Sequence, residues 1–162
     1  TGFMVGKQSE RLGMIKHGAK LIQAVSNVRV PKITFNIGAS FGAGNYAMCG
    51  YAYKPDFIFS WPNAMIGVMG GEQAAKTMEQ VMISSAKRKG VEIDNEKLKN
   101  QIIEIAEKYN AQSDAFTTSG RGLDYGIIEP VKTREILGFL LDTFWETLNR
   151  TTRPNSFGIA RL

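Results

Sequence analysis

The 162-residue sequence contains one cysteine and one histidine, and it has no long hydrophobic run. A single cysteine cannot form an internal disulfide, which is typical of proteins from reducing compartments. The isolated His17 and the lack of metal-ligand spacing predict no metal site. No apolar stretch approaches the roughly 20 residues that cross a bilayer, and the first residues lack the pattern of a signal peptide. We therefore expect no membrane association, and we favour the cytoplasm for a bacterial source and the mitochondrial matrix for a eukaryotic one.

Charge of one sign is only slightly in excess, with a formal net charge of +5. The lysines and arginines are spread along predicted helices and tails without forming blocks, and no aromatic-plus-basic motif for stacking bases is present. These features favour a solvated surface over nucleic-acid binding. An apolar content of 43% with 22% charged residues is typical of one globular domain. Thr1–Gly6 looks like the interior of a domain, so we expect a fragment of a longer polypeptide.

Apolar periodicity, together with glycine and proline positions, predicts helices and strands that alternate along the chain. Helices are expected at about 10–28, 45–49, 72–88, 96–110 and 133–148, and strands at 32–37, 57–61, 65–69 and 125–130. Turns or loops are expected at 1–9, 38–44 and 119–122. This order indicates an α/β layered domain with largely parallel strands.

The segment Gly38–Gly50 follows a predicted buried strand and breaks into glycines before a short helix. Such a turn leaves several backbone N–H groups without intrahelical partners, and the positive end of the helix dipole lies beside them. Donors of this kind can stabilise a developing negative charge. The segment is therefore a candidate oxyanion or anion site.

Three patterns overlap in this segment. Gly38–Gly42 matches the G-x-S-x-G nucleophile elbow around Ser40, but the only histidine, His17, precedes the serine instead of following it. Gly42–Ala47 matches the dinucleotide fingerprint G-x-G-x-x-[GA], but the next strand ends without the required carboxylate. In the third interpretation the amides around Gly42–Gly44 bind an oxyanion directly. The alternative that these glycines only permit tight strand–helix packing stays open.

Two further glycine turns, Gly2–Gly6 and Met69–Glu72, strengthen the third interpretation. Three such turns on one small sheet suggest an active-site face lined by backbone donors. For Glu72 we favour a role as a helix cap over contact with a ligand. Cys49 is expected to be a small buried side chain, and His17 a structural hydrogen-bonding group.

Taken together, these turns resemble the carboxyltransferase subunits of biotin-dependent acyl-CoA carboxylases, members of the crotonase superfamily. The resemblance runs along essentially the whole chain and is strongest for the methylcrotonyl-CoA branch. The segments that carry it are Thr1–Gly6, His17–Lys20, Val30–Thr34, Gly42–Met48, Trp61–Ala64, Val68–Ala75, Gly126–Pro130 and Thr133-Arg134.

The resemblance implies a crotonase-like α/β fold that is incomplete at its N-terminus, with residues 1–162 as part of a C-terminal carboxyltransferase domain. It implies transfer of CO2 from carboxybiotin to an unsaturated acyl-CoA, with 3-methylcrotonyl-CoA favoured. The implied catalytic groups are the backbone amides of Ala43 and Gly44, which stabilise the ureido oxyanion of biotin. The implied biotin-binding residues are Phe3, Met4, Val5, Gly6, Gly42, Asn45 and Tyr46. For Phe3, a purely structural place in the core is an equal alternative.

The resemblance also implies partners. Biotin would be carried on a biotin carboxylase or biotin carrier subunit, and ATP would be used only by that partner. The acyl-CoA is the second substrate, and copies of the same subunit would assemble, with a hexamer expected. Geranyl-CoA or another acyl-CoA is the alternative substrate. A non-catalytic assembly module and a crotonase-type hydratase are the alternative functions, although the hydratase lacks an evident glutamate pair.

Overall fold

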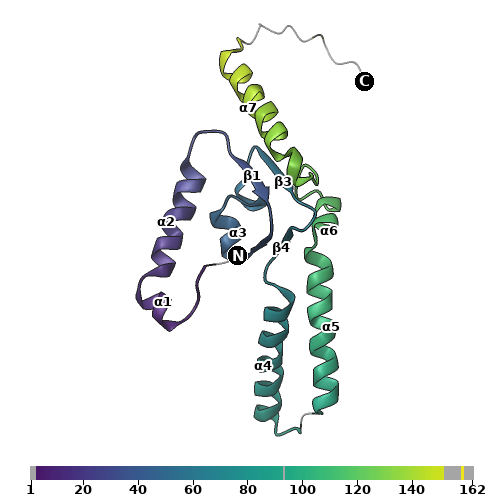
Figure 1. Cartoon of the computed structure of the whole chain (residues 1–162). Coiled ribbons are helices and arrows are strands. Elements are labelled where there is room, and N and C mark those ends of the chain that lie inside the picture. Colours follow the sequence, from purple (N-terminus) through teal and green to yellow (C-terminus); the bar gives the residue numbers. More distant parts are fainter. Residues whose placement is uncertain (1–2, 93, 152–157, 159–162) are drawn as a thin grey trace. The chain divides into compact units, whose positions relative to one another are not determined.

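The computed structural model describes residues 3–92, 94–151 and 158, and its strands form two parallel pairs. β1 (Ile33–Asn36) pairs with β3 (Phe57–Ser60), and β2 (Ala39–Phe41) pairs with β4 (Met65–Gly67). Helices precede, separate and follow these pairs along the chain (Figure 1). The predicted α/β organisation with parallel strands is therefore confirmed.

Three of the four residues in each of β1 and β3 are aromatic or β-branched, as expected for strands on a packed surface. Phe35 and Phe59 face one another in the register, and their ring centroids lie 5.9 Å apart. A polar chain crosses the end of this pair: the Asn36 amide donates to the Ser60 hydroxyl at 3.3 Å, and that hydroxyl donates to the Asp124 carboxylate at 2.6 Å. Ser60 is fully buried, so these bonds satisfy groups that water cannot reach.

The single helix predicted from about residue 10 to 28 is wrong at its start. The structure has α1 (Lys7–Arg11) and α2 (Met14–Asn27), with Leu12 and Gly13 between them. Gly13 has φ 85°, a left-handed conformation that interrupts a helix and that glycine adopts without steric cost. The turn predicted over residues 1–9 is therefore shorter than expected.

The glycine turn predicted from Gly38 begins only at Gly42. Residues 39–41 form β2, and α3 (Gly42–Ala47) begins directly after it instead of near Asn45. Gly42 has φ 55°, so the chain turns from strand to helix within one residue. A short 3₁₀ turn, η1 (Tyr51–Tyr53), then leads to β3, and Cys49 is buried as expected.

Two long helices, α4 (Gly71–Lys89) and α5 (Asn95–Ser113), lie side by side as a hairpin (Figure 1). The face of α4 toward α5 begins with small buried residues, Gly71, Ala74 and Ala75. A Cβ added at Gly71 would lie 2.5 Å from both the Ala106 carbonyl oxygen and the Asn110 Oδ1. The first turn of α4 is therefore held directly against α5. Residues of α5 also contact β4, which fixes this turn beside the second strand pair.

The loop predicted at 119–122 is partly helical, because its first two residues belong to α6 (Ala115–Gly120). The Asp114 carboxylate caps α6 by accepting from the N–H groups of Phe116 and Thr117. Hydrogen bonds from the Thr117 side chain and backbone lower the pKa of Asp114. The predicted strand at 125–130 is reduced to one parallel bridge between Ile127 and Ser60.

The chain divides into two compact units, Thr1–Glu129 and Pro130–Leu162. The described part of the second unit contains η2 (Pro130–Lys132) and α7 (Thr133–Asn149), close to the helix predicted at 133–148. Within the described residues, no helix combines the length and the apolar character needed to span a membrane.

Candidate functional site

The three glycine turns that stand out in the sequence line one cavity of about 860 Å³ in the first unit. We call it the glycine cavity. Its walls come from the N-terminal loop, the β2–α3 junction, β4 with the residue after it, the start of α4, and one residue of α5. These residues are Phe3, Met4, Val5, Phe41, Gly42, Ala43, Met65, Val68, Gly70, Gly71, Glu72, Gln73 and Asn110.

Backbone groups at the start of α3 form one wall of the glycine cavity. The first N–H groups of a helix have no intrahelical acceptor, which leaves those of Ala43 and Gly44 available as donors. Ala43 is exposed and lines the cavity, whereas Gly44 is buried. A Cβ at Gly42 would lie 3.0 Å from the Val68 carbonyl oxygen, so glycine lets the two turns approach closely.

A second helix, α4, also begins at the glycine cavity. Its N-cap residue is Gly70, whose extended backbone is followed by Gly71 as the first helical residue. The expectation that Glu72 caps this helix is wrong, because no side chain caps it. Glu72 lies in the first turn and is the one charged side chain among the described residues that line the cavity. Two helix N-termini therefore face one hollow, and both favour negative charge there.

Phe3 supplies the aromatic wall of the glycine cavity. It is half-buried, and its ring lies so close to Gly18 of α2 that an added Cβ there would be 3.1 Å from the ring. Phe3 and Ala43 also line an adjoining apolar cavity of about 370 Å³ beneath α2. The ring is thus both a packing group against α2 and a surface that faces open space.

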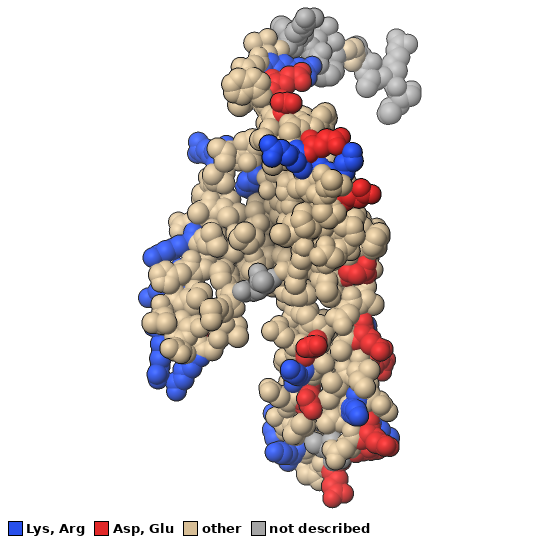
Figure 2. All heavy atoms as spheres, in the orientation of Figure 1, with Lys and Arg blue, Asp and Glu red and all other residues tan. Residues whose placement is uncertain are grey.

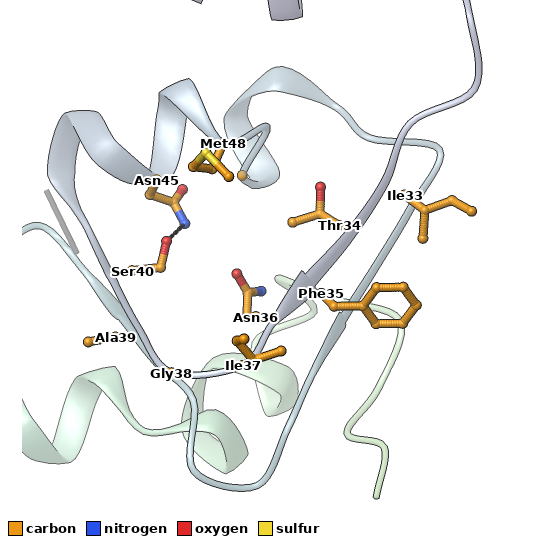
Figure 3. A pocket seen from close by; sticks show the side chains of 11 residues that line it. Ile33, Thr34, Phe35, Asn36, Ile37, Gly38, Ala39, Ser40, Asn45 and Met48 are labelled. Carbon is orange, nitrogen blue, oxygen red and sulfur yellow. Dashed lines mark hydrogen bonds between the residues drawn. The ribbon is translucent and has the colours of Figure 1, made fainter. Parts of the chain in front are cut away.

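A smaller hollow of about 260 Å³ lies beside β1 and the segment that follows it (Figure 3). We call it the serine pocket. Ser40 lies within β2, and its Oγ accepts a hydrogen bond of 2.9 Å from the Asn45 Nδ2. A Cβ at Gly50 would overlap the Asn45 side chain, so glycine makes room for this amide. Ser40 is therefore placed inside a strand, not on the strand-to-helix turn that a nucleophile elbow requires.

Only some of the predicted site residues meet in one place. Phe3, Met4, Val5, Gly42 and Ala43 meet in the glycine cavity, and the buried Gly44 follows directly. Asn45 belongs instead to the serine pocket, and Gly6 precedes α1 without lining the cavity. Tyr46 is exposed, with its ring 5.7 Å from that of Tyr53.

Sequence reasoning missed two polar residues on the lining, Gln73 and Asn110. Gln73 lies two residues after a pair of glycines at the start of a helix. This position could have identified it as a residue of the site. Asn110 lies on α5, far along the chain, and nothing in the local sequence indicates its place.

Comparisons with known proteins agree with this architecture. The family model described as the carboxyl transferase domain matches residues 1–157. The methylcrotonoyl-CoA carboxylase beta chain, mitochondrial, of Arabidopsis thaliana is 45% identical over 162 residues, which is all of this chain and 27% of that protein. The crystal structure of the geranyl-CoA carboxylase beta subunit of P. aeruginosa is 46% identical, with a TM-score of 0.88, and the match covers 100% of this chain and 30% of that one.

The transcarboxylase 12S crystal structure, described as a hexamer assembly with hydrolysed methylmalonyl-coenzyme A bound, is more distant. It is 31% identical with a TM-score of 0.72, over 98% of this chain and 28% of that one. These matches confirm the crotonase-like carboxyltransferase fold. The chain spans 27–28% of the length of the first curated relatives it matches.

Proposed function

This chain belongs to the carboxyl transferase domain family, and from that premise we propose that it builds the biotin side of the active site in a biotin-dependent acyl-CoA carboxylase. The observation that carries the proposal is the glycine cavity, where an aromatic loop and two helix N-termini meet. Its scarcity of charged side chains suits a reaction that depends on positioned backbone donors and exclusion of water.

Biotin, held on a partner subunit that uses ATP to carboxylate it, supplies the carboxyl group that is transferred. The N–H of Ala43, on the cavity lining, would donate to the ureido oxygen of bound biotin, and the N–H of the adjoining buried Gly44 would be the second donor. Both would stabilise the negative charge that this oxygen gains when the carboxyl group is transferred to the acyl-CoA. Such donors are fixed by the fold and need no reorganisation during the reaction. The loss of one of them would raise the barrier by about 3 kcal/mol.

The remaining residues shape the biotin site. Phe3, Met4 and Val5 form an apolar wall for the ring system of biotin, and Gly42 keeps the backbone close to it. Gly6 sets the turn of this loop into α1, since its φ of 117° is open to glycine at little cost. Asn45 and Tyr46 act indirectly, by holding α3 from its other side.

We propose 3-methylcrotonyl-CoA as the acyl substrate, because a relative that matches the whole chain is a methylcrotonoyl-CoA carboxylase beta chain. Geranyl-CoA is the second candidate, since the beta subunit of geranyl-CoA carboxylase has a TM-score of 0.88 to this chain. Assembly into a hexamer is proposed from the 12S relative. The compartment would be the cytoplasm in a bacterium, and the mitochondrion in a eukaryote as for the Arabidopsis relative.

The proposal is tested by removing one backbone donor while the side chain stays small. Ala43→Pro in the full-length subunit deletes the N–H, and proline is tolerated in the first turn of a helix. Carboxyl transfer from the carboxylated acyl-CoA to free biotin, the reverse of the proposed reaction, is expected to fall about 10²- to 10³-fold. Ala43→Gly keeps the N–H and is the matched control, with an expected change of less than about fivefold. Equal rates for the two variants would contradict the proposed role of this amide.

A further inference from the structure

The net charge of the chain is concentrated in its first 32 residues. Six of the 20 basic residues and one of the 15 acidic residues lie there, which leaves fourteen of each sign in the rest of the chain. The basic residues form no contiguous run, as expected, but their excess over the acidic residues lies in this segment. The segment as a unit is strongly cationic, whereas the remainder is balanced.

Five of these cations are exposed on and just after the first two helices. Lys7 and Arg11 lie on α1, Lys16 and Lys20 lie on α2, and Arg29 follows it. We call this set the basic face. Figure 2 shows blue spheres over α1 and α2 without red ones among them. The sixth cation, Lys32, is half-buried and donates to the Tyr53 carbonyl, so it is not part of this face.

The acidic residue of the segment, Glu10, is exposed on α1. Glu10 lines the apolar cavity beneath α2. Within the described residues, no salt bridge forms to any member of the basic face; on α5, by contrast, Lys97 pairs with Asp94 at 3.6 Å. Cations that repel one another without compensation cost stability, so a protein gains from such a face mainly through attraction of an anionic partner.

The opposite side of α2 packs against Phe3 of the proposed active site. Gly18 contacts the Phe3 ring, and Met14 and Ile22 line the cavity that adjoins the glycine cavity. Lys16 and Lys20 are each two residues from Gly18, which places them about 200° around the helix from it. One helix thus supports Phe3, the aromatic wall of the proposed biotin site, on one side and carries cations on the other.

Building on the function proposed above, we propose that the basic face docks an acidic surface of the carrier domain that brings biotin to the glycine cavity. The face extends over two helices, and α2 alone is about 20 Å long, which suits a protein surface better than a single phosphate group. Leu12, between the two helices, is 73% exposed, and an apolar anchor within a charged rim is typical of protein interfaces. A carrier seated there would hold its tethered biotin one helix away from the cavity.

Lys16→Glu with Lys20→Glu tests this docking in the full-length assembled enzyme. The dissociation constant of a fluorescently labelled biotinylated carrier domain is expected to rise about tenfold at low salt, and most of the difference should vanish near 0.5 M salt. The carrier without biotin should show the same salt-dependent difference, because the protein surface and not biotin makes these contacts. Lys89→Glu with Lys99→Glu, on the α4–α5 hairpin, changes net charge equally and should leave affinity within about twofold.

Carboxyl transfer to free biotin separates this inference from the proposed function. If free biotin is a substrate and both double variants bind the carrier alike, the docking surface is wrong while the biotin site stands. A raised KM for the acyl-CoA in the Lys16 and Lys20 variant would assign the basic face to coenzyme A phosphates and overturn the inference. If free biotin is no substrate of the wild-type enzyme, the proposed function fails. The affinities of the two double variants for the carrier domain still show whether the carrier binds the basic face.

Discussion

The glycine cavity and the serine pocket share the β2–α3 segment, yet they are built in opposite ways. The cavity joins loops and helix starts between Phe3 and Asn110, and two helix N-termini bring backbone N–H groups to it. The pocket is lined only by residues between Ile33 and Gly50, and its Ser40 and Asn45 side chains bond to each other. Polar groups that already satisfy one another are poorly placed to bind a substrate. The comparison therefore assigns the chemistry to the hollow with fewer reactive side chains.

Among the substitutions that test this comparison, Gly71→Ala is expected to have the largest effect on stability and on kcat. Gly71→Ala puts a Cβ 2.5 Å from the Ala106 carbonyl oxygen and the Asn110 Oδ1, so the first turn of α4 must move from α5. Overpacking of this kind costs about 1–3 kcal/mol of stability. A displaced turn at the glycine cavity is expected to lower kcat about 10²-fold. Thermal unfolding and carboxyl transfer by the full-length enzyme measure the two effects.

Gly38→Ala is the matched substitution in the serine pocket. A Cβ at Gly38 meets no atom within 4 Å, so stability and kcat are expected to stay close to wild type. If Gly38→Ala impairs kcat as strongly as Gly71→Ala does, the two hollows do not differ in the way proposed.

A smaller effect is expected from the aromatic wall. Phe3→Ala opens the glycine cavity into the space beneath α2 and removes the surface proposed to contact biotin. The KM for free biotin should rise about tenfold, because the lost apolar contact is worth roughly 1–2 kcal/mol. Phe3→Leu keeps an apolar group of similar reach and should stay within about threefold. If Phe3→Ala leaves the KM for free biotin unchanged and lowers the melting temperature, Phe3 only packs against α2 and does not contact biotin.

The order of elements could be predicted from the sequence because its signals are local. Proline and glycine positions, together with apolar periodicity, placed α4, α5 and α7 to within three residues at each end. The break between α1 and α2 was missed because a lone glycine inside a helical pattern is often tolerated. β2 was missed because its partner β4 is distant in the chain, and a three-residue strand has too little pattern of its own.

The candidate site shows the same limit. Glycine turns are visible in a sequence, so Phe3–Val5, Gly42 and Ala43 could be singled out. Their meeting in one cavity depends on pairing between β2 and β4 and on the contact of Gly71 with α5, which are long-range packing events. Asn45 was assigned to the biotin site from the resemblance to the carboxyltransferase family. The structure turns its amide toward Ser40, on the lining of the other hollow.

The smallest effect is expected where the sequence looks most like an enzyme motif. Ser40→Ala removes the acceptor of the Asn45 amide and should cost about 1 kcal/mol of stability. The rate of carboxyl transfer should change less than about twofold, since Ser40 does not line the glycine cavity. A serine nucleophile would lose about 10⁶-fold on the same substitution. More than five orders of magnitude separate the two outcomes, so one rate measurement decides whether Ser40 acts as a nucleophile at the β2–α3 segment.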